Sequence, residues 1–186
     1  MAHHVCPFWI GYLLASPVRR LWHDPKSIVR PYVHPGSVVL EPGPAMGFFT
    51  LELARAVGDR GRVVAVDVQP KMLAALRRRA DRRGLLSRID ARQVTGEHLP
   101  VEDLRGSVDF VLLFAMVHEV PDQAIFWGDV VGTMKAGAKL LVAEPKGHVT
   151  KEAFAATLEQ AGRAGLFVES EPRIASSHAV LLRKSS

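Results

Sequence analysis

Short apolar runs alternate along the chain with longer segments whose apolar residues recur every three or four positions. The runs are rich in β-branched residues, and several lack any alternation with polar residues. That pattern is typical of strands buried on both faces of a parallel sheet, whereas the longer period is typical of amphipathic helices. The alternation predicts an α/β fold with a mostly parallel sheet. Strands are predicted at 37–41, 63–67, 89–94, 108–114, 139–143, 166–171 and 175–182.

Turn and capping residues bound the predicted helices. Gly58 and Gly84 stop the first two helices, and Pro70 opens the second. Proline suits the first turn of a helix, and glycine suits the position just past its end. Thr150 is a candidate N-cap for the last helix. Helices are predicted from the glycine-rich turn after the first strand up to 58, and at 70–84, 126–134 and 150–162.

The first two predicted strands flank a turn of small residues. Gly43, Ala45 and Gly47 stand between the first strand and the helix that follows it. The first strand ends at Glu41 and the second at Asp67. Small residues let the backbone approach a ligand and expose the N–H groups at the start of the helix to it. An acid about 20 residues beyond the glycines can accept hydrogen bonds from ribose hydroxyls.

Two ligand classes use such a turn with different glycine spacings. The dinucleotide pattern G-x-G-x-x-G places Gly43, Ala45 and Phe48 at its three positions, and a phenylalanine at the third would block close packing of the helix. This disfavours an NAD-type oxidoreductase. The other pattern, acid-x-G-x-G-x-G, starts at Glu41 and ends at Gly47, with Ala45 at the middle position. It resembles the first motif of class I S-adenosylmethionine (SAM) methyltransferases.

The chain from residue 37 onward resembles that family in four motifs, which occur in the family's order. The second motif is the acid in VVAVDVQPKML, and the later two are SVDFVLLFAMVHEVPD and MKAGAKLLVAEPKG. The small-molecule "type 11" branch, which includes the ubiquinone and menaquinone C-methyltransferases, is the most similar. The resemblance implies a Rossmann-like seven-stranded sheet of order 3-2-1-4-5-7-6 with helices on both faces. It also implies a closing antiparallel hairpin, which dinucleotide-binding folds do not usually have.

The resemblance further implies a SAM site, with S-adenosylhomocysteine as the product. The glycine-rich turn would admit the methionine part, Asp67 would bind the ribose, and residues 95–97 would frame the adenine. Phe114 would lie under the adenine or near the sulfonium. The predicted cofactor-binding residues are Glu41, Gly43, Pro44, Ala45, Gly47, Asp67, Val68, Thr95, Gly96, Glu97 and Phe114. A SAM-binding module without methyl transfer would carry the same motifs and stays open as an alternative.

The loops after the fourth and fifth predicted strands lie at the same sheet edge and are expected to contact the methyl acceptor. His118 can act as a general base near neutral pH, or it can make a structural bond at a helix start. Glu144 and Lys146 follow the fifth strand. The chain lacks the N/D-P-P-Y/F tetrapeptide of enzymes that methylate adenine or glutamine amides. The prediction is in-line methyl transfer to a small apolar acceptor, without a metal site.

An apolar block at 8–22 precedes the predicted core. We predict a helical cap over 1–35 and a Rossmann-like core over 36–186, together forming one domain. The block is interpreted as a helix packed on the core, or as a substrate lid of the kind common in the family, which would bring Trp9 and Tyr12 to the acceptor. A third interpretation is an interfacial helix in peripheral contact with a membrane, because arginine and tryptophan suit the headgroup region.

Seven arginines lie within residues 77–92. Such a basic segment is able to bind RNA, which makes an RNA methyltransferase the alternative to a small-molecule enzyme. No interleaved aromatic residue offers a surface for stacking bases, so the solvated outer face of a crossover helix is the simpler interpretation. The net charge of +5 permits an acidic partner without requiring one.

The composition adds few constraints. With 186 residues, 48% of them hydrophobic and 23% charged, the chain fits an ordinary globular domain. A single cysteine excludes an internal disulfide and a cysteine-based metal site, and it favours a reducing cytoplasm. The first residues lack signal-peptide features, and no apolar run approaches the roughly 20 residues needed to span a bilayer. We therefore expect a cytoplasmic protein without a transmembrane segment.

Overall fold

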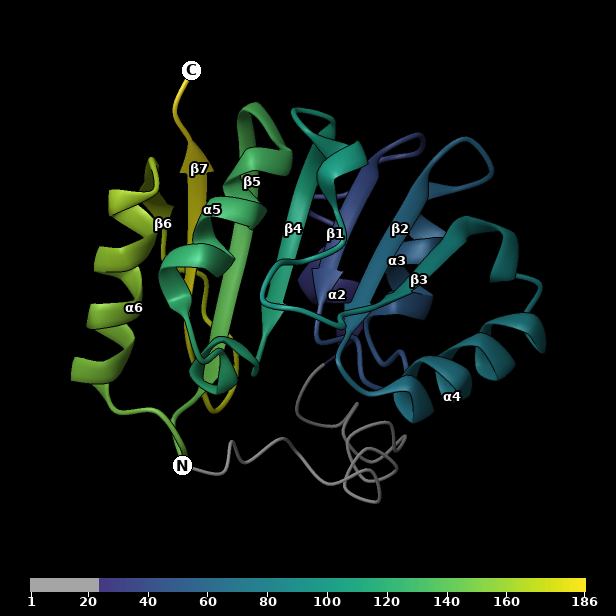
Figure 1. Cartoon of the computed structure of the whole chain (residues 1–186), viewed down its shortest axis with the longest axis horizontal. Helices are drawn as coiled ribbons and strands as arrows, with labels where there is room; N and C mark the ends of the chain where they lie inside the picture. Colours follow the sequence, from purple (N-terminus) through teal and green to yellow (C-terminus); the bar gives the residue numbers. More distant parts are fainter. Residues whose placement is uncertain (1–23) are drawn as a thin grey trace.

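One sheet of seven strands forms the centre of the molecule, of which a computed structural model describes residues 24–186 (Figure 1). The strands are β1 (Val38–Pro42), β2 (Arg62–Asp67), β3 (Ile89–Gln93), β4 (Val108–Phe114), β5 (Met134–Pro145), β6 (Leu166–Ser170) and β7 (Ser177–Lys184). Their order is β3-β2-β1-β4-β5-β7-β6. The first five are parallel, and β7 pairs antiparallel with β5 and β6. The predicted fold class, strand order and closing hairpin are confirmed.

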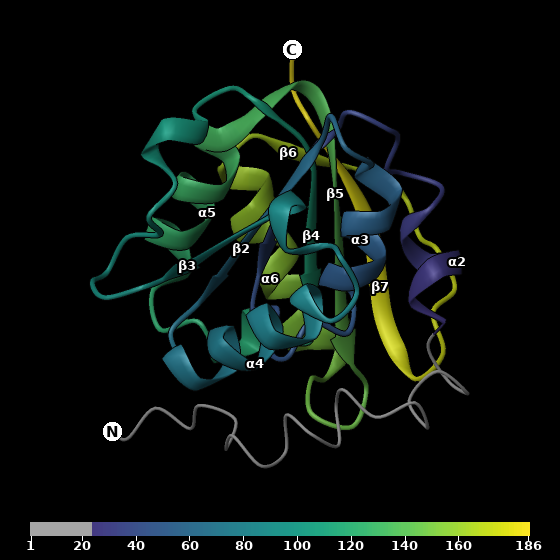
Figure 2. The same cartoon turned by 90° about the vertical axis from the view of Figure 1, so that its right-hand side faces the viewer.

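Helices cover both faces of the sheet (Figure 2). They are α2 (Pro25–Val29), α3 (Thr50–Val57), α4 (Pro70–Asp81), α5 (Gln123–Thr133) and α6 (Lys151–Arg163), with short 3-10 turns η2 (Leu86–Arg88), η3 (Glu102–Leu104) and η4 (Val117–Glu119). Helices α5 and α6 pack on one face through residues such as Trp127 and Phe154. Helices α2, α3 and α4 pack on the other, where Leu53 and Leu76 are buried. Each face therefore has its own core, as expected for a parallel sheet.

Helix α4 follows the predicted pattern closely. The stripe Met72, Leu76 and Ala80 is buried against the rest of the domain. Gly84, with φ of +63°, donates its N–H to the carbonyl of Asp81, and the next residue donates to the carbonyl of Ala80. This is the Schellman arrangement, which requires a left-handed residue after the helix and so favours glycine. The predicted stop at Gly84 is confirmed, although the regular helix ends at Asp81.

The predicted start of helix α5 and the predicted extent of strand β5 were wrong. Helix α5 begins at Gln123, three residues earlier than predicted, because the Asp122 carboxylate caps the N–H groups of Ala124 and Ile125 at 2.9 and 3.0 Å. Strand β5 spans Met134–Pro145, far beyond the predicted 139–143. Its first residue, Met134, leaves the helix and pairs at once with Val108 of β4, before the ladder resumes with a register shift.

Two more predictions concern the start of the last strand and the N-terminal cap. β7 starts at Ser177, two residues later than predicted, after a turn in which Ser176 has φ of +56°. Within the predicted cap (1–35), Asp24 caps the short helix α2, whose Val29 is fully buried against the core. Residues 1–23, which hold most of that cap, lie outside the described residues.

Candidate functional site at the carboxyl edge of the sheet

The loops that follow β1, β2, β4 and β5 meet at one edge of the sheet, the lower edge in Figure 1. Gly43 is exposed there and has φ of +70°. A Cβ atom at Gly43 would lie 3.0 Å from Cβ of Met116 in the loop after β4, and one at Gly47 would overlap the Leu76 side chain. Glycine at these two positions therefore allows the turn after β1 to pack directly on α4 and on the loop after β4.

Glu41 ends β1 below this turn and is almost fully buried, with 3% of its surface exposed. Its Oε2 atom and the hydroxyl of Thr50 have no hydrogen-bond partner among the described residues. Burial raises the pKa of the Glu41 carboxyl to about 8; the Thr50 hydroxyl, near enough to donate to the ionised form, opposes that rise, and the charge of Asp67 adds to it. A buried carboxyl with an unpaired oxygen is costly, which is typical of a group that receives a ligand.

Asp67 ends the neighbouring strand β2 and is also buried. Its Oδ1 atom accepts a hydrogen bond from the Gln69 N–H at 2.8 Å. Burial raises the pKa of Asp67 to about 6, the N–H groups of Gln69 and Ala45 lower it, and the charge of Glu119 raises it. The effect of Glu119 shows that the loop after β4 brings a third carboxylate to this edge.

The other predicted cofactor residues surround the same edge. Val68 is an exposed apolar residue directly after Asp67. Residues 95–97 lie exposed in the loop after β3. Phe114 ends β4, and its ring packs on that of Phe49 with centroids 4.4 Å apart. Pro44 and Ala45 are part of the turn itself, where Ala45 has φ of +47°, a strained value for a non-glycine residue.

The loop that contains residues 95–97 is anchored on its C-terminal side, at Leu99 and Pro100. The Leu99 N–H donates to Asp129 of α5 at 2.8 Å, and the Arg92 guanidinium donates to the Pro100 carbonyl at 2.7 Å. Sequence reasoning missed Asp129, because nothing in the sequence pairs an acid on α5 with a loop 30 positions earlier. These bonds give the exposed stretch a fixed position beside the carboxyl edge.

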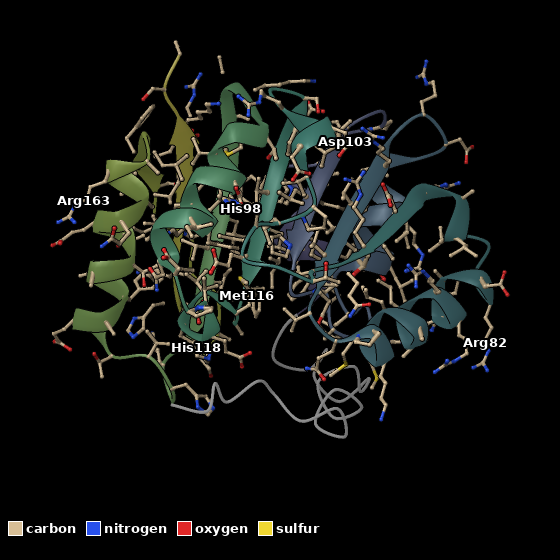
Figure 3. All side chains as sticks on the ribbon, viewed as in Figure 1. Arg82, His98, Asp103, Met116, His118 and Arg163 are labelled. Atoms are coloured by element: carbon tan, nitrogen blue, oxygen red, sulfur yellow. The ribbon has the colours of Figure 1, made fainter. Side chains whose placement is uncertain are left out.

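His118 and Glu144, predicted separately, form a pair. Glu144 ends β5 with 1% of its side chain exposed, and its Oε2 lies 2.5 Å from Nδ1 of His118. Its Oε1 accepts the backbone N–H groups of Val117 at 2.7 Å and Met116 at 3.2 Å. The bond to Glu144 raises the pKa of His118, burial opposes that rise, and the charges of Glu144 and Glu119 add to it. Figure 3 shows Met116 and His118 at the lower edge of the sheet.

The other residues predicted to contact the methyl acceptor are Lys146, Trp9 and Tyr12. Lys146 follows β5 with its side chain exposed, and its N–H donates to the Ser176 carbonyl at 3.0 Å. Trp9 and Tyr12 lie outside the described residues. Within residues 24–186, no three histidine, cysteine, aspartate or glutamate side chains lie close enough together to hold a metal ion. Over the same range, no helix combines the length and apolar character needed to cross a membrane.

The arginine-rich segment 77–92 differs from the predicted solvated face. Four of its seven guanidinium groups donate to backbone carbonyls of neighbouring elements rather than pointing only into solvent. They are Arg77 (to Ala91), Arg79 (to Met46, at 2.5 Å), Arg88 (to Ala54, at 3.2 Å) and Arg92 (to Pro100, at 2.7 Å). The prediction was wrong for Arg79, which is only partly exposed because its long side chain reaches over the edge of α4 to an adjacent backbone oxygen. Arg77 stays exposed on the helix, and Arg88 and Arg92 lie beyond it in η2 and β3.

Comparison with known proteins assigns the chain to a family. Residues 40–142 match the family described as "Methyltransferase domain", which is more than half of the chain. Ubiquinone/menaquinone biosynthesis C-methyltransferase UbiE of Teredinibacter turnerae is 28% identical over 145 residues, covering 76% of this chain and 57% of that protein. The same enzyme of Haemophilus ducreyi is 30% identical over 132 residues, covering 71% and 50%. The chain thus spans about half the length of the curated relatives it matches.

Solved structures share the fold. A SAM-dependent methyltransferase from Aquifex aeolicus superposes with a TM-score of 0.84 at 22% identity, covering 96% of this chain and 99% of that one. The [4+2]-cyclase SpnF superposes with a TM-score of 0.71 at 15% identity, covering 86% and 80%. One fold thus carries more than one reaction. The motifs, the strand order and the match over residues 40–142 together show that the chain belongs to the class I SAM-dependent methyltransferases of the type 11 branch, whose cofactor is SAM.

Proposed function

We propose that this protein transfers a methyl group from SAM to a small-molecule acceptor. The observation that carries the proposal is the carboxyl edge of the sheet. Here an open glycine turn, two buried carboxyls and a histidine–glutamate pair lie at the ends of neighbouring strands and in the loops that follow them. The names of the relatives, which are C-methyltransferases of quinone biosynthesis, support a small acceptor.

The residues at this edge fit the cofactor. The unpaired, buried oxygen of Glu41 suits a cationic amino group, and Asp67 offers carboxylate oxygens to ribose hydroxyls. The exposed Gly43 leaves the backbone open to close approach. We assign the adenine to the anchored loop at 95–97 together with Val68, and the region near the sulfonium to Phe114. When bound, SAM supplies an electrophilic methyl group, so the protein mainly has to align the acceptor and exclude water.

We assign the acceptor side to the loops after β4 and β5, with Lys146 at its rim, and to the N-terminal block through Trp9 and Tyr12. The apolar character of that block favours an apolar acceptor. An RNA acceptor is disfavoured because four of the seven arginines between 77 and 92 bond to the protein's own backbone. A cytoplasmic location remains a prediction from cysteine usage.

Two measurements test this proposal. The first is a labelled-methyl transfer screen with cell extract, read by mass, in which we expect a small methylated product together with S-adenosylhomocysteine. Methylated RNA as the sole product would contradict the small-molecule assignment. Formation of neither product by a chain that binds S-adenosylhomocysteine would contradict methyl transfer itself.

The second measurement is calorimetry of S-adenosylhomocysteine on Asp67→Ala. This change removes acceptors for the ribose hydroxyls, and hydrogen bonds to a charged group are each worth roughly 1.5–3 kcal/mol, so affinity should fall about 10- to 100-fold. Asp59→Ala is the matched control, because Asp59 lies exposed before β2, at the opposite edge of the sheet. Wild-type affinity in Asp67→Ala would contradict the assignment of this site.

A further inference from the structure

His118, in the turn η4 after β4, and Glu144, near the end of β5, together restrict the chemical class of the methyl acceptor. Resting on the proposed function, we propose that the acceptor is protic at the atom that receives the methyl group. We further propose that His118 takes that proton through Nε2 and that Glu144 is the residue that positions the His118 ring. The acceptor would then be a hydroxyl, an enol or an acidic carbon, and not a thioether or a tertiary amine.

Glu144 fixes the ring in one orientation and one tautomer. Its carboxylate is 1% exposed and holds the Met116 and Val117 N–H groups through Oε1, so it cannot turn away from His118. The Oε2 atom lies 2.5 Å from Nδ1. Because a carboxylate only accepts hydrogen bonds, Nδ1 carries the hydrogen, and Nε2 of the neutral ring keeps its lone pair. The ring is therefore prepared to take a proton at Nε2.

The Nε2 atom lies on the side of the ring away from Glu144, near another carboxylate of the same loop. It lies 4.0 Å from Oε1 of Glu119, the carboxylate whose charge also raises the pKa of Asp67. The His118 side chain is 30% exposed, so a ligand can reach it. Its other face stacks on His148, with ring centroids 6.4 Å apart and planes 11° from parallel. The reactive nitrogen thus lies at the same carboxyl edge as Asp67, on a side chain that is partly open to a ligand.

A comparison with His98 distinguishes this pair from a structural bond. His98 also lies next to a carboxylate, with Nδ1 3.0 Å from Asp129, and both carboxylates also accept backbone N–H groups. The two pairs differ in burial, because the His98 and Asp129 side chains are 65% and 19% exposed, against 30% and 1% for His118 and Glu144. Glu144, in contrast, is a buried charge, which is costly unless a cation lies beside it. Proton uptake by His118 creates that cation, so the fold favours the protonated product of the step, as in catalytic triads.

The proposed step balances in atoms and charge. The acceptor X–H gives its proton to Nε2 of His118, which becomes an imidazolium. The electron pair left on X forms the bond to the methyl carbon, and the sulfur keeps the pair of the broken S–C bond as S-adenosylhomocysteine. His118 then releases the proton to water. One proton therefore appears for each S-adenosylhomocysteine formed, whereas a proton-free nucleophile would become a cation and release none.

The groups that face the ring set the expected pH dependence. They are Glu144 of β5, Glu119 of η4 and His148 of the loop after β5. The bond to Glu144 raises the pKa of His118, so the neutral, active form is lost as the pH falls through that raised value. The rate should therefore decline on the acid side. In Glu144→Gln the raising charge is gone, and the decline should move to lower pH.

The experiment uses the full chain and the acceptor found in the extract screen. His118→Gln should lower kcat about 10²- to 10⁴-fold, the usual contribution of a general base, and abolish the acid-side decline. Glu144→Gln should lower kcat about 10²-fold or more, because its amide can donate to Nδ1 and force the hydrogen onto Nε2. The affinity for S-adenosylhomocysteine should stay within about twofold. His34→Gln, at the amino end of β1, is the matched control.

Two readouts do not depend on kcat. A pH-indicator assay in weak buffer should show one proton released per S-adenosylhomocysteine. Nitrogen NMR of the free protein should show the neutral His118 ring protonated at Nδ1 and a pKa above that in Glu144→Gln. Full activity of His118→Gln, absence of proton release, or a ring protonated at Nε2 would each overturn the inference. Cofactor binding without any methyl transfer would overturn the proposed function, and the ring measurement would still decide whether the pair is built as inferred.

Discussion

The two edges of the sheet treat buried polar groups differently. At the amino edge, Asp109 accepts the Val38 N–H at 2.8 Å and lies 2.5 Å from the Lys135 ammonium. At the carboxyl edge, the Glu41 and Thr50 side chains hold the two buried side-chain oxygens that have no partner among the described residues. At the amino edge the buried atom that lacks a partner within residues 24–186 is a donor, Nε of Arg88 just before β3, whereas the carboxyl edge leaves acceptor oxygens open near the ends of the strands.

Backbone strain separates the edges in the same way. Ala45 and Ala115, with φ of +47° and +56°, follow β1 and β4 at the carboxyl edge. At the opposite edge the Lys184 ammonium donates to the carbonyls of Val131 and Met134 at 2.8 Å each, closing the end of α5. Strained residues and unpaired oxygens thus coincide with the ligand site that we propose, and the rest of the fold supplies the stability that they cost.

The largest expected effect comes from Glu41→Gln, because this change removes an ionisable buried carboxyl from the carboxyl edge. The folded-state pKa of Glu41, about 8, lies above its ordinary value of 4.5, so its contribution to stability is complete below pH 4.5 and is lost as the pH rises to about 8. Glutamine cannot ionise and escapes this loss. Relative to wild type, the variant should gain roughly 3–5 kcal/mol of unfolding free energy across that range.

Urea unfolding at a series of pH values from 4.5 to 8.5 measures that gain. Glu159→Gln, the same change on an exposed carboxylate of α6, is the control and should follow the wild-type curve. Parallel curves for Glu41→Gln and wild type would mean that Glu41 ionises freely in the folded protein. The variant should also bind S-adenosylhomocysteine more weakly, because stability and binding are opposed at this residue.

The second expected effect is smaller and lies at the amino edge. Asp109→Ala leaves the Val38 N–H without its acceptor and should lower the unfolding free energy by about 1–3 kcal/mol. Asp109→Asn keeps an acceptor oxygen and should retain most of that stability. Neither change should alter the affinity for S-adenosylhomocysteine, since the site is at the other edge. A loss of affinity in calorimetry would show that the two edges are coupled.

The sequence predicted the frame of the molecule better than the contacts of its site. Unbroken apolar runs identified the strands, because burial on both faces leaves no room for polar residues. The pair of His118 and Glu144 could not be predicted, because a separation of 26 positions contains no signal for a hydrogen bond. Arg79 was likewise assigned to solvent, since a helical pattern gives the face of a residue but not where a long side chain ends.

The smallest expected effect concerns the arginines of α4. Arg78 and Arg82 are exposed, and Figure 3 shows Arg82 at the end of this helix, whereas Arg79 donates to the Met46 carbonyl in the glycine turn at 2.5 Å. Replacing both Arg78 and Arg82 with Gln should change the unfolding free energy by less than about 0.5 kcal/mol. Methyl transfer and S-adenosylhomocysteine affinity should stay at wild-type values.

Arg79→Gln is the matched comparison within the same helix. It removes a charge-assisted bond that holds the turn after β1, so it should weaken S-adenosylhomocysteine binding severalfold while Arg78→Gln with Arg82→Gln does not. Binding of a structured RNA, measured over a range of salt, separates the two views of this helix. If the exposed arginines contact phosphates, their replacement should reduce the salt slope by about one per contact. An unchanged slope would leave α4 as an outer helix that supports the site through Arg79 alone.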